Sequence, residues 1–217
     1  MIRLYLIRHG RQNSPLCNVD VPLEEAGFRQ AKLVAKRLKI YDIQALYSSN
    51  LIRAIQTAEI IGEELSLTNR IEEAFQEISF GELTGLSDEE IKDKYSEFLK
   101  ERGKAIEDIP CPGGETGKDV YNRAFPVMER IIKEAKENGI ENIAIVTHGG
   151  VIRTMVAGVL GAEFAKKLCV AKELENCGIT QIDYDDKNDK YIVERVNDYA
   201  HIEAEPELMR RYFKKSL

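Results

Sequence analysis

The chain has 217 residues, of which 43 % are hydrophobic and 31 % are charged, and its formal net charge is −6. These values are typical of a soluble globular domain, and the excess of acidic residues argues against a broad basic surface that would bind nucleic acid. The sequence contains no apolar run close to the ~20 residues that span a membrane, and no secretory leader. We therefore expect a cytoplasmic protein that binds neither nucleic acid nor membrane.

The histidines and cysteines do not form a metal-binding pattern. No histidine stands four residues from another, and the 4 cysteines are scattered without a CxxC pair. Structural zinc sites and redox-active dithiols both require such close spacing. The sequence therefore predicts no metal site, and it predicts reduced thiols.

Hydrophobic periodicity divides the chain into strands and helices. The predicted elements follow in chain order. They are strand 2–7, helix 22–39, strand 43–47, helix 51–65, a short strand within 70–75, helix 88–100, a helix ending near 138, strand 143–147, helix 151–161, strands 179–184 and 191–196, and helix 206–217. Several boundaries carry capping signals. Ser49 or Asn50 is the expected N-cap of the second helix, and Ser87 with Glu90 forms a capping box before the third. Pro126 predicts a kink or a late start of the fourth helix.

Strands that alternate with helices predict an α/β protein. The expected fold is a three-layer α/β/α arrangement with a mainly parallel central sheet and helices on both faces. The segments at 179–184 and 191–196, joined by a turn rich in Asp and Asn, predict an antiparallel hairpin. The basic residues of the last helix are expected to form a solvated face rather than a binding patch: Arg210, Arg211, Lys214 and Lys215.

Cationic and imidazole side chains stand at three junctions where a strand is followed by a helix. The first carries Arg8 and His9, the second Arg53 and the third His148. The carboxyl ends of parallel strands meet at one edge of a sheet, where helix N-termini also point their N–H groups. Arg53 opposes the helix dipole, at a cost of about a few tenths of a kcal/mol, unless an anion binds at the same helix N-terminus. This combination predicts a phosphate site, in which a neutral imidazole could act as a nucleophile. Alternatively, His148 is a core histidine with both nitrogens hydrogen-bonded.

The order of these motifs resembles that of the histidine phosphatase superfamily, also called the phosphoglycerate mutase-like proteins. The resemblance covers most of the chain and rests on LIRHG at 6–10, residues 22–31, SSNLIRAIQTA at 48–58, residues 77–85, GGE at 113–115 and THGGVIR at 147–153. It implies a phosphoglycerate mutase-like fold in which residues 1–217 form a single domain. It also implies an inserted loop and helical region, about 78–117, that lies over the active site.

The resemblance implies a role for each residue of the predicted site. His9 would attack phosphorus and become a phosphohistidine, while Arg8, Arg53 and His148 would bind the phosphoryl oxygens. Glu77 would be the general acid that protonates the leaving oxygen and then the base that activates water. Phosphoryl transfer depends mainly on positioning and charge stabilisation, so these cationic groups make a metal ion or another cofactor unnecessary.

The segment after the first histidine departs from the usual family pattern. Gln12, Asn13 and Gly149 are expected to bind substrate, but Asn18 is an alternative phosphate contact to Gln12 or Asn13. Arg11 is an additional cation in this segment. We expect it to point to solvent, and the alternative is a contact to a substrate with additional negative charge.

The activity that the resemblance implies is hydrolysis of a small phosphorylated metabolite, a phosphomonoester, without a metal ion. Two alternatives are a phosphoglycerate mutase and a non-catalytic phosphate-binding protein. The stretch between Glu77 and His148 is shorter than in family mutases, which leaves less chain to shield an intermediate from water. The presence of both His9 and Glu77 argues against a non-catalytic protein. Residues 113–115 and 148–153 also resemble α-ribazole phosphatases, and the sequence leaves a homo-oligomer open.

Overall fold

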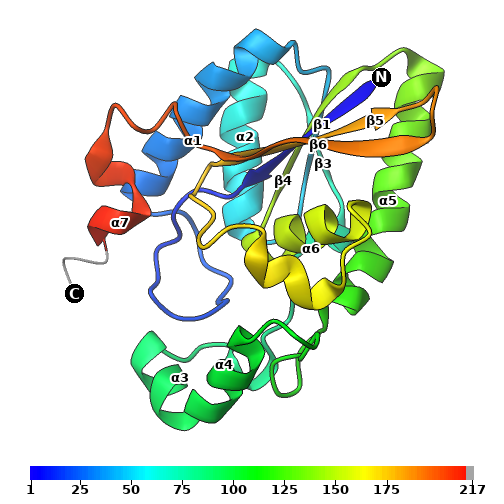
Figure 1. Cartoon of the computed structure of the whole chain (residues 1–217). Helices are drawn as coiled ribbons and strands as arrows, with labels where there is room; N and C mark the ends of the chain where they lie inside the picture. The colour runs from blue at the N-terminus through cyan, green and yellow to red at the C-terminus, as the bar shows by residue number, and fades with distance from the viewer. Residues whose placement is uncertain (214–217) are drawn as a thin grey trace.

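A six-stranded sheet forms the centre of the computed structural model, which describes residues 1–213 (Figure 1). Its strands in chain order are β1 (Ile2–Arg8), β2 (Ala45–Ser48), β3 (Asn69–Ile71), β4 (Asn142–Thr147), β5 (Ile179–Asp185) and β6 (Lys190–Asp198). The spatial order is β3-β2-β4-β1-β5-β6, in which the first four are parallel and β5 and β6 form an antiparallel hairpin at one edge. The predicted mainly parallel sheet is confirmed.

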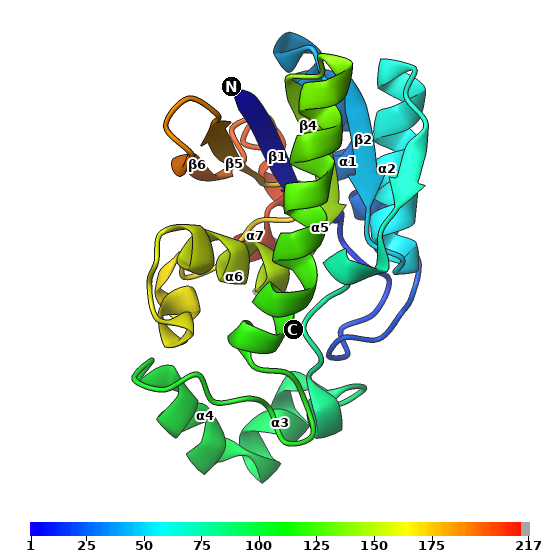
Figure 2. The ribbon, with the colours of Figure 1, turned by 90° about the vertical axis from the view of Figure 1, so that its right-hand side faces the viewer.

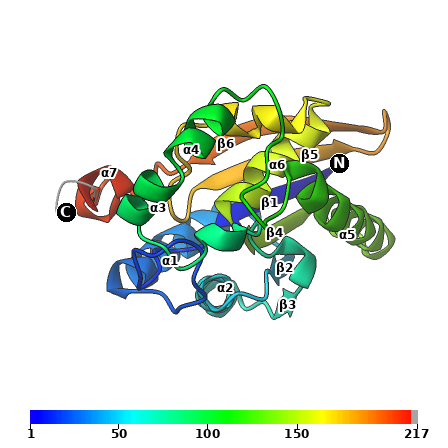
Figure 3. The same cartoon turned by 90° about the horizontal axis from the view of Figure 1, so that it is seen from below.

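Helices cover both faces of this sheet. Those described are α1 (Glu25–Leu38), α2 (Ile52–Leu65), α3 (Asp88–Lys94), α4 (Ser96–Gly103), α5 (Gly117–Asn138), α6 (Gly149–Val159) and α7 (Arg210–Phe213). Helices α1 and α2 pack on one face, whereas α5 and α6 pack on the other (Figures 1 and 3). The predicted three-layer α/β/α arrangement is therefore confirmed.

The residues of β1 show why both faces are covered. Successive side chains of a strand point to opposite faces, so Leu4 and Leu6 enter the core under α5 and α6, and Tyr5 and Ile7 enter the core under α1 and α2. All four are buried. Strands that are buried on both faces have continuous apolar runs rather than alternating apolar and polar residues. The run at 2–7 is of this continuous kind.

Helices α3 and α4 lie beyond the carboxyl ends of the parallel strands, apart from the main layers (Figure 2). The capping box of Ser87 and Glu90 is present, but the single helix predicted over 88–100 is divided at Tyr95, which has φ −124° and ψ 24°. Tyr95 packs on a small apolar cluster that includes Leu83, and its hydroxyl donates to Glu82. The break lets both short helices place apolar side chains in this cluster.

Two other boundaries differ from the predictions. Leu51, rather than Ser49 or Asn50, is the N-cap of α2, and the Ile52 N–H donates to Asp20 Oδ1 at 2.9 Å. A side chain from the preceding loop therefore caps this helix. Pro126 lies inside α5, so the late start is wrong.

The C-terminal segment returns to the α1 side of the sheet, where Leu208 and Met209 are buried. The continuous helix predicted from residue 206 is wrong, because Pro206–Leu208 form a single 3₁₀ turn and Met209 is extended, with φ −81° and ψ 141°. Helix α7 begins only at Arg210, and positions 214–217 of the predicted helix lie outside the described residues. None of the helices in residues 1–213 is both long enough and apolar enough to cross a membrane.

Candidate active site

Three adjacent strands deliver the predicted site residues to one edge of the sheet. Arg8 of β1 stands beside Thr147 of β4 in the parallel register, and the His9 N–H donates to Thr147 O at 2.9 Å. His9 and His148 therefore leave neighbouring strands side by side, with ring centroids 5.0 Å apart. The convergence inferred from the strand ends is present in the structure.

The His9 ring is held in one tautomer. Its Nδ1 lies 2.7 Å from Gly10 O, and because a carbonyl can only accept, Nδ1 carries the proton. The other nitrogen, Nε2, accepts from Arg53 Nε at 3.3 Å. Burial lowers the pKa of His9 well below its ordinary value, and His148 and Arg53 act in the same direction. His9 is thus a neutral imidazole whose unprotonated Nε2 faces a guanidinium group.

Arg53 is buried in the first turn of α2 with a side chain that is 2 % exposed. Its Nη1 donates to Val19 O at 2.9 Å, and its Nη2 donates to Asn18 Oδ1 at 3.1 Å. Asn18 has a φ of 47°, a left-handed conformation that asparagine tolerates better than most residues. Among the three candidates for the phosphate contact, Asn18 is therefore the one bonded to Arg53.

Gln12 and Asn13 lie in the same loop. The Gln12 amide Nε2 donates to Ser14 O and Leu16 O, so this group braces the loop, while Asn13 lines the cavity in front of His9. Arg11 also lies in the cavity wall, where its Nε pairs with Glu24 Oε1 at 2.7 Å. The expectation that Arg11 points to solvent is wrong, because Glu24 holds it at the wall.

His148 is fully buried at the N-cap of α6. Its Nε2 is 2.7 Å from Ser49 Oγ, while its Nδ1 is buried and finds no hydrogen-bond partner among the described residues. Burial lowers the pKa of His148 well below its ordinary value, and the guanidinium groups of Arg53 and Arg8 add to this effect. The alternative of a core histidine with both nitrogens satisfied does not hold.

Arg8 completes the cationic wall. Its Nη1 donates to Leu174 O, whereas its Nε is buried without a partner in the described part of the chain. Burial, and after it the charge of Arg210, lowers the pKa of Arg8 to about 9, so the group remains protonated at neutral pH. A buried cation with an unused donor favours binding of an anion.

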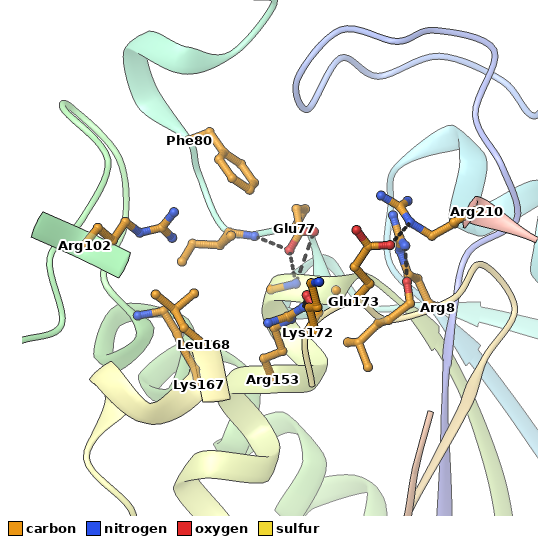
Figure 4. A pocket seen from close by; sticks show the side chains of 14 residues that line it. Arg8, Glu77, Phe80, Arg102, Arg153, Lys167, Leu168, Lys172, Glu173 and Arg210 are labelled. Carbon is orange, nitrogen blue, oxygen red and sulfur yellow. Dashed lines mark hydrogen bonds and ion pairs between the residues drawn. The ribbon is translucent and has the colours of Figure 1, made fainter. Parts of the chain in front are cut away.

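Glu77 is anchored by backbone N–H groups. Its Oε1 accepts from Ile78 N at 2.9 Å and from Gly150 N at 3.0 Å, and its Oε2 makes only a longer contact of 3.3 Å to Gly150 N (Figure 4). Any Cβ at Gly150 would lie 2.5 Å from Glu77 Oε1, so glycine is needed there for the carboxylate to come this close. Gly149, the first residue of α6, lies beside it in the wall of a neighbouring cavity.

A cavity of about 700 Å³ contains the reactive groups of this site. Its lining includes His9, Arg8, Arg53 and Glu77, and this volume is within the usual range for small-molecule sites. Among residues 1–213, no three His, Cys, Asp or Glu side chains are grouped so that they could hold a metal ion. The cationic side chains that line the cavity are all arginines, namely Arg8, Arg11, Arg53 and Arg210.

Three residues to which the sequence analysis gave no role hold the site in place. Thr57 Oγ1 accepts from Gly10 N at 3.0 Å, and Asn176 Nδ2 donates to His9 O at 2.9 Å. Arg123 donates to Glu77 O at 3.3 Å and pairs with Glu115 at 2.8 Å, which braces the Glu77 segment. Thr57 stands one helical turn after Arg53, a spacing that could have revealed it, whereas nothing near Asn176 in the sequence does so.

Arg210 also belongs to the site. The prediction of a solvated basic face at the C-terminus is wrong at this residue, because Arg210 lines the cavity that holds His9. Its backbone N–H donates to both Glu175 carboxylate oxygens at 3.1 Å, and this brings the start of α7 against the site.

Residues 4–198 match the model of the histidine phosphatase superfamily (branch 1). The chain belongs to this superfamily. Phosphoserine phosphatase 1 of Hydrogenobacter thermophilus is 30 % identical over 171 residues, which cover 76 % of this chain and 80 % of that protein. A probable phosphoglycerate mutase of Yersinia pestis is 27 % identical over 216 residues, which cover 94 % of this chain and 96 % of the mutase.

A solved structure supports the same placement in the histidine phosphatase superfamily. Mycobacterial glucosyl-3-phosphoglycerate phosphatase in complex with inorganic phosphate matches with a TM-score of 0.82 and 25 % identity, over 93 % of this chain and 99 % of that chain. The phosphoglycerate mutase-like fold and the superfamily resemblance are thereby confirmed. The narrower likeness to α-ribazole phosphatases stays a prediction.

Proposed function

We propose that this histidine phosphatase hydrolyses a small phosphomonoester through a phosphohistidine at His9, without a metal ion. The observation that supports this most strongly is the state of His9: Nδ1 donates to Gly10 O, and the unprotonated Nε2 accepts from Arg53 Nε at 3.3 Å. A neutral imidazole with an unprotonated nitrogen is a nucleophile, and the surrounding cations would hold the phosphoryl group against it.

In the proposed first step, His9 Nε2 forms a bond to phosphorus while the bond from phosphorus to the ester oxygen breaks. Arg8, Arg53 and His148 bind the phosphoryl oxygens. The charge of these oxygens satisfies Arg8 Nε and His148 Nδ1, which otherwise have no hydrogen-bond partner among the described residues. The Gly10 carbonyl, 2.7 Å from Nδ1, stabilises the positive charge that the ring gains. Glu77 gives its proton to the leaving oxygen, because an alkoxide is a poor leaving group.

In the second step, the Glu77 carboxylate takes a proton from water, the resulting oxygen attacks phosphorus, and the bond between nitrogen and phosphorus breaks. Phosphate leaves, and His9 returns to its neutral form. Oε2 of Glu77 suits both proton transfers, because Oε1 already accepts two backbone hydrogen bonds.

The test is turnover and trapping. We expect His9→Ala to lower phosphate release by on the order of 10³-fold or more, as removal of a covalent nucleophile does. The control is His201→Gln, a histidine outside the cavity that contacts Cys177 O. Wild-type protein should form an acid-labile phosphoenzyme that His9→Ala lacks. Wild-type turnover by His9→Ala, or loss of activity with a chelator, would refute the proposal.

A phosphoglycerate mutase is the second candidate, because a probable mutase is similar over 94 % of this chain. Incubation with 3-phosphoglycerate separates the two activities, since a mutase would produce the 2-phosphate isomer and a phosphatase would release inorganic phosphate. We expect phosphate release. A panel of phosphorylated metabolites, with α-ribazole phosphate among them, would then identify the substrate. A protein that binds phosphate but turns over none of these esters would be the non-catalytic alternative.

A further inference from the structure

A second, smaller cavity has a volume of about 280 Å³ and adjoins the one that contains His9. Figure 4 shows the residues that line this smaller cavity. The two cavities share Arg8, Glu77, Phe80 and Arg210 in their walls, whereas only the larger one reaches His9. Glu77 therefore stands at the boundary between the reacting centre and the smaller cavity.

The geometry of the proposed reaction indicates on which side of phosphorus the leaving group lies. In phosphoryl transfer, the attacking and leaving atoms lie roughly in line on opposite sides of phosphorus. Because Glu77 is the proposed proton donor to the leaving oxygen, the leaving group lies on the Glu77 side. Because Glu77 and Phe80 line both cavities, a leaving group on this side has direct access to the smaller cavity.

The charge of the smaller cavity is opposite to that of the chain as a whole. Its lining contains six cationic side chains and two acidic ones, although the chain carries a net charge of −6. Lys167 is already paired with Asp108, and Arg8 also faces the phosphoryl site. The other four cationic residues of this lining are Arg102, Arg153, Lys172 and Arg210, and its two acidic residues are Glu173 and the boundary residue Glu77.

Some of the arginines in the smaller cavity have N–H groups without a hydrogen-bond partner among the described residues. The Nε atoms of Arg102 and Arg210 are buried and make no hydrogen bond to any described residue, although Arg210 Nε lies 3.8 Å from Glu173 Oε2. Arg153 donates to Lys172 O at 3.1 Å, which orients its guanidinium. Burial lowers the pKa of Arg153, with the Glu77 charge opposing and the Arg210 charge adding to this effect. Collecting like charges in a half-buried space is unfavourable unless an anion compensates them.

We propose that the smaller cavity is a second anion subsite, which binds a carboxylate or phosphate group carried by the leaving group of the substrate. Arg102 from α4, Arg153 from α6 and Arg210 from α7 recognise this group. The small volume limits the substrate to a few atoms between its two anionic groups. The inference rests on the proposed phosphatase function and narrows its substrate class.

Matched pairs of phosphate esters test the proposed anion subsite. The carboxylate pair is 3-phosphoglycerate and glycerol 1-phosphate, and the phosphate pair is propane-1,3-diol bisphosphate and 3-hydroxypropyl phosphate. We expect wild-type kcat/KM to favour the anionic member of one pair by about tenfold or more, as a charged hydrogen bond does. The pair with the larger preference identifies the second group.

Arg102→Gln and Arg153→Gln should bring that preference close to one, while kcat/KM for the neutral ester stays within about threefold. Arg130→Gln, an exposed arginine of α5 paired with Glu72, is the matched control and should keep the preference. A wild-type preference of one, or a preference that survives in both variants, overturns the subsite. Arg102 is on an outlying helix, so its variant is informative even if Arg153→Gln does not fold.

Failure of the phosphatase proposal gives a different result, because no member of either pair would then be hydrolysed. In that case, calorimetric titration with 3-phosphoglycerate and with inorganic phosphate tests the subsite alone. We expect the wild type to bind 3-phosphoglycerate more tightly than phosphate. We expect Arg153→Gln to bind the two ligands with equal affinity. Equal binding of both ligands to the wild type would overturn the subsite.

Discussion

Gly150→Ala is the substitution that most directly tests how Glu77 is held. The new Cβ would lie 2.5 Å from Glu77 Oε1 and 2.5 Å from Ile78 Cγ2, well inside van der Waals contact. The carboxylate must therefore move. The bonds that it accepts from Gly150 N, 3.0 and 3.3 Å long, are then lost or distorted.

The size of the effect depends on the leaving group. Proton transfer by a positioned side chain contributes roughly 10²–10⁴ to a rate, so kcat/KM for an alkyl phosphate should fall by about 10²–10³. The p-nitrophenolate ion leaves without a proton. For p-nitrophenyl phosphate, kcat/KM reports the steps through phosphorylation of His9 and should stay within about fivefold of wild type.

The assay compares both esters in Gly150→Ala and in a control, Gly103→Ala. Gly103 is the last residue of α4, and a Cβ there would meet nothing within 4 Å. Alanine is favoured over glycine in a helix by about 1 kcal/mol, which offsets part of an overpacking cost of about 1–3 kcal/mol, so the variant should fold. An equal loss on both esters, or full activity on the alkyl phosphate, would refute the role given to Glu77.

Three further predictions concern His148 and residues that brace the site. Burial lowers the pKa of His148 below 6.5 and that of His201 to about 4 in the folded protein. Below about pH 6.5 the unfolded chain therefore binds more protons than the folded protein, and the free energy of unfolding falls as the pH is lowered. In urea unfolding between pH 6.5 and 5, His148→Gln should reduce this pH dependence by up to about 1.4 kcal/mol per pH unit, and an unchanged slope would contradict it. Arg123→Met leaves the Glu115 carboxylate without its partner, and the free energy of unfolding should fall by about 2 kcal/mol, against little change in the exposed variant Arg130→Met. Ser49→Ala removes the 2.7 Å bond to His148 Nε2, and the inhibition constant for inorganic phosphate should rise by about tenfold; an unaltered constant would show that this bond does not position His148.

Local patterns predicted much of the fold. The run at 2–7 is apolar enough to be recognised as a strand covered on both faces, and the Ser87 and Glu90 capping box marks the start of α3 within the chain itself. The N-terminus of α2 could not be placed in this way. Its first N–H is bonded to Asp20, which lies 32 residues earlier in the chain. Tyr95 likewise ends a helix that local propensity would continue, because its side chain packs on Leu83 and bonds to Glu82.

The sequence by itself determined which side chains end the buried strands, because a strand that is apolar on both faces must place its first polar residues at the sheet edge. His9 and His148 are therefore identifiable from the order of residues alone. Only the tertiary structure decided which residues from distant segments join them. Arg210 reaches the site because its backbone N–H bonds to Glu175, and Arg123 reaches Glu77 across 46 positions of the chain. Contacts of this kind depend on how the layers pack, and no periodicity within a single segment encodes them.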